Sequence, residues 1–156
     1  MFIKRVFRLA LLSVFLLLAP AWAQTSPEAV VGTIRGFYQA IDAQDFGKAW
    51  SLLTEASKFR VVAMVAEEAK IPPEQVRPLF DNTAPEIRDG FWKSFAEGEQ
   101  TKVVLNLTLE YKGEKDGFHV VTASMPVEQG GSGQTLDFLL KDEAGPKYGI
   151  AETFNF

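Results

Sequence analysis

The stretch Lys102-Val-Val-Leu-Asn-Leu-Thr-Leu-Glu-Tyr-Lys112 decides the predicted fold. In an extended chain one of its faces would be polar apart from Val104, and the other would consist of Val103, Leu105, Leu107, Leu109 and Tyr111. Successive side chains of a β-strand point to opposite faces, so this alternation predicts a long strand with one buried face and one wet face. Such a strand needs a cover, which the helices predicted before it and the strands predicted after it would supply.

Residues 1–23 are predicted to be a secretory signal peptide that is cleaved after Ala23. Three basic residues precede an apolar run of 11 residues, and small residues, Ala21 and Ala23, occupy the minus-three and minus-one positions. The run is too short to span a bilayer, which takes about 20 residues, so an uncleaved anchor is the weaker alternative and no stable membrane insertion is expected after cleavage. The sequence contains no cysteine, which excludes a lipid-modified cysteine and disulfides. We therefore expect a periplasmic protein.

Residues 24–156 are predicted to form one domain of 133 residues, a size that can bury a core without disulfides. This part contains all 20 acidic residues but only 13 of the 16 Lys and Arg, so its formal net charge is −7. An acidic surface without a basic cluster argues against nucleic acid as a partner.

The segment before residue 100 predicts helices. Ser26-Pro27-Glu28 is typical of a helix start, because serine can cap, proline fits the first turn and an acid suits the positive end of the helix. An apolar stripe then recurs at spacings of three and four residues, through Val30, Val31, Ile34, Phe37, Tyr38 and Ile41.

Three further helices are expected. Asp45 would cap a short second helix with inward-facing Phe46, Ala49, Trp50, Leu52 and Leu53. A third helix is predicted over 57–69, with Phe59, Val62, Val65 and Ala66 turned inward, and it ends at Pro72-Pro73 because proline lacks the amide hydrogen. The last is predicted over 85–96 and ends at Gly98, and it would bury Ile87, Phe91 and either Phe95 or Trp92.

Asp116-Gly117 predicts a hairpin turn. A three-residue loop over 115–117 with Gly117 left-handed would pair Tyr111 with Val121 and Leu109 with Ala123. A two-residue turn would instead turn Thr122 and Ser124 inward, so burial favours the longer loop. The residues then expected on the buried face of the second strand are His119, Val121, Ala123, Met125 and Val127.

Two more strands complete the predicted sheet. Pro126 indicates an edge or a bulge, and the glycine-rich residues 130–133 indicate a connection. A third strand is predicted over 134–141, burying Leu136, Phe138 and Leu140, and a fourth over 147–156, burying Tyr148, Ile150 and Phe154. Helices followed by an antiparallel meander of about four strands predict an α+β fold with the helices on one side.

Both ends of this part of the chain resemble the nuclear transport factor 2-like (cystatin-like α+β) superfamily. Its opening pattern is similar to Val30-Val-Gly-Thr-Ile-Arg-Gly-Phe-Tyr-Gln-Ala-Ile-Asp-Ala-Gln-Asp-Phe-Gly-Lys-Ala-Trp-Ser-Leu-Leu53, and its closing pattern to Ala144-Gly-Pro-Lys-Tyr-Gly-Ile150, with Tyr148 where many secreted members have tryptophan. Residues 56–99 are longer and more helical than that pattern. The resemblance implies N-terminal helices packed on the concave face of a bent sheet, and leaves the function open between isomerases, dehydratases, transport receptors and exported domains without assigned activity.

Four side chains are the candidates for catalysis. Strand alternation would turn Glu152 toward the apolar face, where burial could raise its pKa and make it a general base, or the last strand frays and Glu152 reaches water. Tyr38 and Tyr111 could donate hydrogen bonds into a cone, or they pack in the core. His119, the single histidine, is expected at the surface or the rim, with an acid–base role in a pocket as the alternative. No metal or cofactor is expected.

The favoured hypothesis is a non-catalytic domain that binds a small apolar ligand or an envelope protein in a cone between helices and sheet. It depends on a supply of large side chains without a convergent polar set, for which the proposed ligand-binding residues are Phe37, Phe91, Phe138 and Tyr148. One alternative is an isomerase- or dehydratase-like enzyme with Glu152 as its base. Another is a homodimer that pairs through exposed apolar residues of the wet sheet face, namely Val104, Phe118, Val120 and Leu139.

Overall fold

The computed structural model describes residues 25–125 and 133–155. The elements are α1 (Pro27–Asp42), α2 (Phe46–Ser51), α3 (Glu55–Ala69), α4 (Pro73–Asp81), α5 (Pro85–Ile87), the π-helix η1 (Arg88–Trp92), α6 (Lys93–Glu97), α7 (Glu99–Leu105), β1 (Thr108–Lys115), β2 (Phe118–Ser124), β3 (Thr135–Asp142), β4 (Pro146–Tyr148) and α8 (Ile150–Phe154). Helices precede an antiparallel sheet of order β1-β2-β3-β4, so the predicted α+β class is confirmed. Predictions for 1–23 and for Pro126 and Val127 concern residues outside the described ranges.

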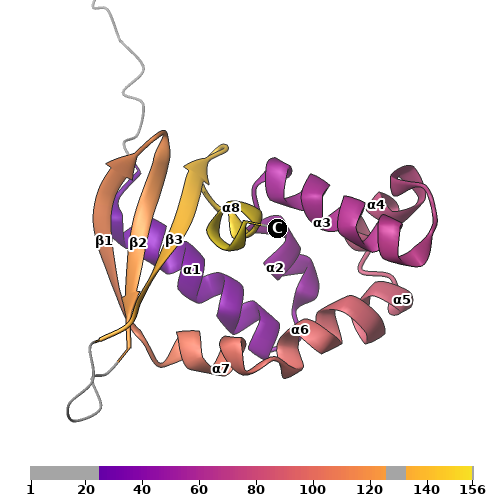
Figure 1. Ribbon diagram of the computed structural model, residues 1–156, viewed down its shortest axis with the longest axis horizontal. Coiled ribbons are helices and arrows are strands. Elements are labelled where there is room, and N and C mark those ends of the chain that lie inside the picture. Colours follow the sequence, from indigo (N-terminus) through magenta and orange to yellow (C-terminus); the bar gives the residue numbers. More distant parts are fainter. Residues whose placement is uncertain (1–24, 126–132, 156) are drawn as a thin grey trace, which may run out of the picture.

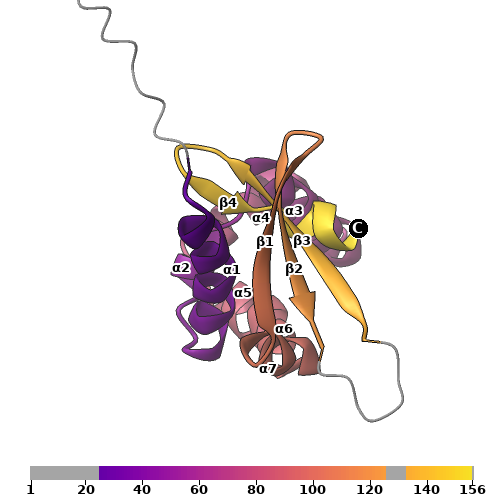
Figure 2. The same ribbon diagram turned by 90° about the vertical axis from the view of Figure 1, so that its left-hand side faces the viewer.

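The sheet forms one end of the molecule, and the α3–α4 pair forms the other (Figure 1). α1 runs between them and contacts β1, β2 and β4 on one face of the sheet (Figure 2). Its start is the predicted one, because the Ser26 hydroxyl accepts a hydrogen bond from the amide of Ala29 at 3.2 Å. The predicted stripe is also confirmed, apart from a half-buried Val31, since the fully buried residues of α1 include Val30, Ile34, Phe37, Tyr38 and Ile41.

The deciding stretch is half helix, which corrects the predicted strand over 102–112. α7 extends to Leu105, and β1 begins only at Thr108. The reason is a second period in the same residues, because the buried Thr101, Val104 and Leu107 recur every three positions. Val104, the exception to the alternation, is 3% exposed, whereas Val103 is 42% exposed. The helical period therefore prevails up to Leu105, and the alternation holds in β1.

The hairpin has the predicted register with a different turn. Tyr111 lies opposite Val121 and Leu109 opposite Ala123, as expected. The turn has two residues rather than three, because Lys115 pairs with Phe118 and both Asp116 (φ 53°) and Gly117 (φ 79°) are left-handed. A bulge between Tyr111 and Gly113 takes up the extra residue and restores the buried face. Met125, predicted to be buried, is 37% exposed because β2 ends at Ser124.

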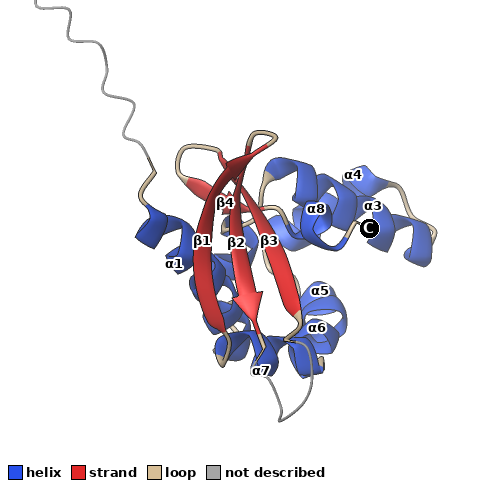
Figure 3. Cartoon of the chain, turned by 60° about the vertical axis from the view of Figure 1, so that its left-hand side comes forward, coloured by secondary structure: helices blue, strands red, loops and turns tan. Residues whose placement is uncertain are grey.

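The end of the chain differs most from the prediction. The expected strand over 147–156 is a three-residue β4 followed by α8, which packs beside β3 and α3 (Figure 3). Gly149 separates the two elements, and its amide donates to the carbonyl of Leu139 at 2.8 Å. Tyr148 joins the sheet to the helical half, because its amide donates to Leu52 and its carbonyl accepts from Thr54, at 2.7 and 3.0 Å.

The helices on the far side pack largely as predicted. Asp45 caps α2, Gly98 ends α6, and the buried residues of α2 include Phe46, Ala49 and Trp50. Phe59 corrects the prediction for α3, because it is 68% exposed. α3 buries the predicted Val62 and Ala66 together with Ser57 and Val61, and a helix places Ser57 and Val61 on the opposite side from Phe59. No helix within the described ranges combines the length and apolar character needed to cross a bilayer.

The expected outer face of the sheet is only partly as predicted. Val104 lies in α7 and is buried rather than exposed. Phe118, Val120 and Leu139 are half-buried, and α8 covers part of β3, since the amide of Leu139 donates to the Thr153 hydroxyl at 2.9 Å. The homodimer therefore stays a prediction with three of its four proposed residues at the surface.

Candidate functional site

The interface between α1 and the sheet is filled by aromatic side chains. Phe37, Tyr38, Phe138 and Tyr148 are all fully buried. Phe37 and Tyr148 meet edge to face at a centroid distance of 5.1 Å, and Phe138 lies 5.9 Å from Tyr148. Three of the four predicted ligand-binding residues thus pack against each other here, and Phe138 and Tyr148 face each other and α1 rather than a hollow cone.

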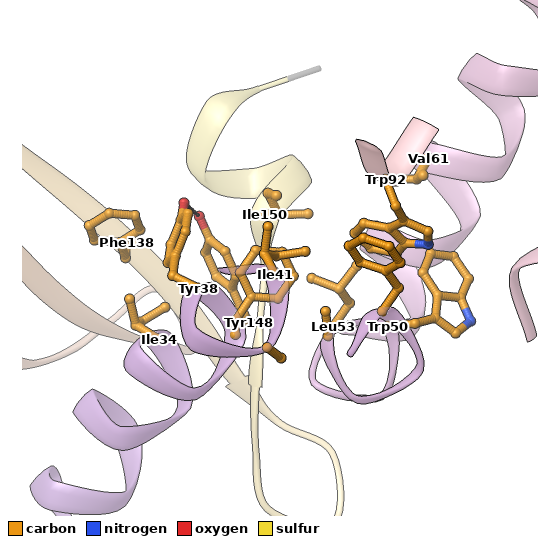
Figure 4. Close-up of a cluster of buried hydrophobic side chains, with 14 of the residues drawn as sticks. Ile34, Tyr38, Ile41, Trp50, Leu53, Val61, Trp92, Phe138, Tyr148 and Ile150 are labelled. Carbon is orange, nitrogen blue, oxygen red and sulfur yellow. Dashed lines mark hydrogen bonds between the residues drawn. The ribbon is translucent and has the colours of Figure 1, made fainter. Parts of the chain in front are cut away.

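The two buried tyrosines use their hydroxyls on each other. The hydroxyl oxygens of Tyr38 and Tyr148 lie 3.3 Å apart (Figure 4). Burial raises the pKa of Tyr38 to about 12, against the smaller opposing effect of the hydrogen bond to Tyr148. Burial, followed by the charge of Tyr38, also raises the pKa of Tyr148 well above its usual value. Tyr38 therefore stays neutral and bonded within the core, which makes its predicted role as a donor to a substrate sterically unfavourable.

His119 lies in the core, which corrects the expectation of a surface or rim histidine. It is 4% exposed, with Nδ1 3.1 Å from the Tyr111 hydroxyl and Nε2 3.1 Å from Oδ2 of Asp142. The Thr25 hydroxyl donates to Oδ1 of the same carboxylate at 2.7 Å. Glu114 also approaches, with Oε1 3.5 Å from Nδ1. The chain of contacts joins β1, β2 and β3 to the residues just before α1.

The charge of Asp142 and the tautomer of a neutral His119 follow from their hydrogen-bond partners. The Thr25 hydroxyl, and after it the His119 imidazole, hold the pKa of Asp142 below its usual range against the opposing effect of burial. An ionised Asp142 accepts only, so a neutral His119 carries its hydrogen on Nε2 and Nδ1 accepts from Tyr111. Two of the four catalytic candidates, Tyr111 and His119, are thus brought together. Sequence spacing did not reveal Asp142 or Thr25 as their partners.

Glu152 lies in α8, which corrects the strand on which its predicted orientation depended. Its Oε2 accepts a hydrogen bond from the Ser57 hydroxyl at 2.7 Å. Ser57 is fully buried, and its oxygen also accepts from the amide of Ala151 at 3.2 Å and the hydroxyl of Thr54 at 2.9 Å. The carboxylate therefore helps to hold α8 on α3. Its role as a base stays a prediction without geometric support.

A pocket does exist, among the helices instead of beneath the sheet. Its volume is about 140 Å³. The walls come from α1, α3, η1, α6, α8 and the residue before Thr54, and they are entirely apolar: Phe37, Leu53, Val61, Met64, Phe91, Trp92, Phe95 and Ile150. Met64 is 41% exposed and Phe91 and Phe95 are half-buried, so the pocket opens to the surface beside them.

Two predicted ligand-binding residues, Phe37 and Phe91, line this pocket, and the others do not. Phe37 is in contact with both regions, since its ring lies 5.9 Å from Phe95 and 5.1 Å from Tyr148. Leu53 and Ile150 were expected only as buried positions, and the inward face predicted for α3 did not include Val61. The feature that brings them together is the α8 turn, which no periodicity in the sequence indicated.

Trp92 forms one wall of the pocket and has a buried polar atom, the indole nitrogen Nε1. The residue is 1% exposed, and its Nε1 has no hydrogen-bond partner among the residues that the structure describes. In Figure 4 this nitrogen lies on the side of Trp50, which meets Trp92 edge to face at 6.3 Å and 79°. An indole N–H beside a ring face makes a weak contact with the π electrons. The pocket therefore remains apolar in character.

A second hollow, at the end of α1, is less suited to a specific ligand. It measures about 450 Å³, and its charged residues are balanced in sign: Asp42, Arg88, Asp89, Lys93, Glu97 and Lys102. Arg88 already pairs with Asp89 at 2.8 Å, and Lys93 approaches Glu97 at 4.0 Å. Exposed pairs of this kind interact weakly and stay hydrated. Within the described ranges, no group of three or more His, Asp or Glu residues is placed to hold a metal ion.

Comparisons with protein-family models, with curated proteins and with solved structures give no match. Any functional conclusion therefore depends on the geometry and chemistry of the chain itself.

Proposed function

We propose that this chain is an exported, periplasmic, non-catalytic domain of the nuclear transport factor 2-like kind, which binds a small apolar ligand in the pocket lined by Phe37, Val61, Trp92 and Ile150. The observation that carries the proposal is a hollow whose walls are all apolar, placed between α1, α3, η1 and α8. A hollow lined only by aliphatic and aromatic side chains favours an apolar occupant over water, and this one is open to a ligand beside Met64.

The size of the hollow limits the ligand. An engineered cavity of about 150 Å³ lined by leucine, isoleucine and phenylalanine binds benzene, and pockets for drug-sized ligands start at about 300 Å³. A volume of about 140 Å³ therefore suits one aromatic ring or the end of a short alkyl chain. The same volume could hold one apolar side chain of an envelope protein, which is the alternative occupant.

The enzyme alternative has less support. Its base, Glu152, is bonded to Ser57, and its donor Tyr38 is bonded to Tyr148 in the core. Neither group lines the apolar pocket, so no described acid or base would meet a ligand bound there.

An NMR titration with toluene tests the proposal. We expect saturable shifts of the methyl signals of Leu53, Val61 and Ile150, and no comparable shifts on the outer sheet face. The variant V61F fills the pocket with a ring and should abolish binding. The variant F59L is the matched control on the same helix, because Phe59 is 68% exposed and does not line the pocket.

A second blocking variant guards against misfolding of V61F. Met64 is 41% exposed at the mouth of the pocket, so M64W should fold normally and slow or prevent entry of toluene. If the wild type shows no saturable shifts up to the aqueous solubility of toluene, the proposal is wrong. The same holds if folded V61F and M64W bind toluene as the wild type does.

A further inference from the structure

The apolar pocket adjoins a larger groove between α3 and the segment α5–η1–α6. The groove measures about 590 Å³ and shares Phe91 and Phe95 with the pocket. On the α3 side, Val65 lines the groove and the adjacent Met64 lines the pocket. A ligand whose tail fills the pocket would therefore continue along these residues into the groove.

The π-helix η1 contributes Gly90 and Phe91 to the lining of this groove. Residues four apart lie close to one face of a helix, and Ile87, Phe91 and Phe95 have this spacing along the groove floor. Trp92, the next residue after Phe91, turns into the core instead. Gly90 lines the groove within η1, and no atom lies within 4 Å of the position that a Cβ would take there. π turns of this kind occur frequently at functional sites.

The charge at the groove has one sign. Glu68 of α3 and Glu86 of α5 line it from opposite walls, and the lining contains no Lys or Arg. Both carboxylates are exposed, and neither forms an ion pair with another residue of the described ranges. A groove with Ile87, Phe91 and Phe95 on its floor and two carboxylates without ion-pair partners among its lining residues is complementary to an apolar tail with a cationic head.

We propose that the pocket and groove together bind a cationic amphiphile, an amine with an aromatic or short alkyl tail, with the tail between Phe91 and Ile150 and the ammonium group between Glu68 and Glu86. This inference rests on the proposed function, because the tail occupies the same apolar pocket. It adds the class of ligand, which the pocket alone does not define.

Three probes of equal size and different charge provide the test: 4-phenylbutylamine, 4-phenylbutan-1-ol and 4-phenylbutyrate. We expect isothermal titration calorimetry to rank their affinities in the order amine, alcohol, carboxylate. Each of the variants E68Q and E86Q should lower the affinity for the amine about two- to fivefold, as loss of an exposed charge contact predicts, and leave the affinity for the alcohol unchanged. Toluene should compete with the amine.

The matched control is E67Q, which removes an exposed carboxylate from the same helix at a position that does not line the groove. It should leave the preference for the amine unchanged. All three substitutions are at exposed positions, so the variants should fold. Raising the ionic strength to about 0.5 M should weaken the amine preference, because salt screens exposed charges.

The outcomes separate this inference from the proposed function. Equal affinities for amine and alcohol would overturn the inference and leave an apolar pocket that binds uncharged ligands. An equal effect of E67Q would mean that only net charge attracts the amine, and lack of competition by toluene would place the tail elsewhere, so either result also overturns it. If none of the three probes binds but toluene does, the inference alone is wrong, and if toluene does not bind either, the proposed function is wrong as well.

Discussion

Replacing Ser57 by alanine should detach α8 from the body of the protein. The Ser57 oxygen is fully buried and takes part in three hydrogen bonds, to Oε2 of Glu152 at 2.7 Å, from the hydroxyl of Thr54 at 2.9 Å and from the amide of Ala151 at 3.2 Å. Alanine removes this oxygen without adding bulk. The partners are then left without it, and only those that can reach water or rotate will find a replacement.

The expected loss in free energy of unfolding depends on which groups cannot replace their hydrogen bond to Ser57. The amide of Ala151 is buried, and a buried donor without an acceptor costs about 1–3 kcal/mol. Glu152 is half-buried, so water compensates for part of its loss, and the Thr54 hydroxyl can rotate. We expect S57A to lower the free energy of unfolding by about 2–4 kcal/mol, a large share of the roughly 5–15 kcal/mol typical of a domain.

Urea unfolding followed by tryptophan fluorescence measures this loss. The control S94A removes a hydroxyl from an exposed position in α6 and should change stability by less than about 0.5 kcal/mol. A double-mutant cycle with E152A, which removes the acceptor of the Ser57 hydroxyl, should give a coupling of about 1 kcal/mol or more, since the two groups are in direct contact. A loss below about 0.5 kcal/mol for S57A, or additive effects in the cycle, would refute the reasoning. Because Ile150 of α8 lines the pocket, S57A should also weaken toluene binding.

Three further results are expected. I150A removes a pocket wall that is 3% exposed, so urea unfolding should show a loss of about 2–4 kcal/mol, and a loss below about 1 kcal/mol would mean that α8 is not packed as described. G32A should gain about 0.5–1 kcal/mol in the same assay, because Gly32 is inside α1 with no atom within 4 Å of its Cβ position, and a loss would indicate an unseen contact. The lowered pKa of Asp142 means that its stabilisation is complete above about pH 4 and disappears as the pH falls through the lowered pKa, so D142N should flatten the acid side of a stability–pH curve, and an unchanged acid side would contradict the Thr25 and His119 contacts.

The strongest sequence patterns predicted structure well where one period dominated. α1 has a capping serine, an early proline and an apolar stripe at helical spacing, and all three agree with the structure. The hairpin register was also predictable, because shifting a strand by one residue exchanges its buried and exposed faces. The turn was not, since a bulge at a distant position can compensate for a shorter loop. Burial of the apolar face determined the register of β1 and β2, and the bulge allowed the turn between them to have two residues.

The sequence predictions were wrong where one segment contained two hydrophobic periods, or where contacts between residues distant in sequence determined the structure. Residues 101–107 contain both an alternation and a three-residue repeat, and packing against α1 favours the helical one. Over 147–156 the spacing of Tyr148, Ile150 and Phe154 suits a strand, but Gly149 lets the chain turn and Ser57 holds the resulting helix. The alternation placed His119 on the buried face of β2, whereas its polar character beside a turn suggested a surface or rim position, and only the buried position is confirmed. Its partners Asp142 and Thr25 are remote in sequence, so their approach could not be foreseen.

The pocket among the helices lowers the stability of the protein, because its walls lack the contacts that a filled core would make. Large-to-small substitutions elsewhere cost about 24 cal/mol for each Å³ of cavity, so a void of about 140 Å³ corresponds to an upper limit of roughly 3 kcal/mol of missing contacts. The aromatic residues beneath the sheet show that this chain can fill comparable space completely, with Phe37, Phe138 and Tyr148 fully buried. A single larger residue at Val61 would close the gap among the helices, so we expect V61F to remove binding, and urea unfolding measures whether filling the gap also raises stability. A gain in stability together with a loss of binding would be the trade-off expected of a pocket kept open for an occupant, and a loss of stability in folded V61F would contradict it.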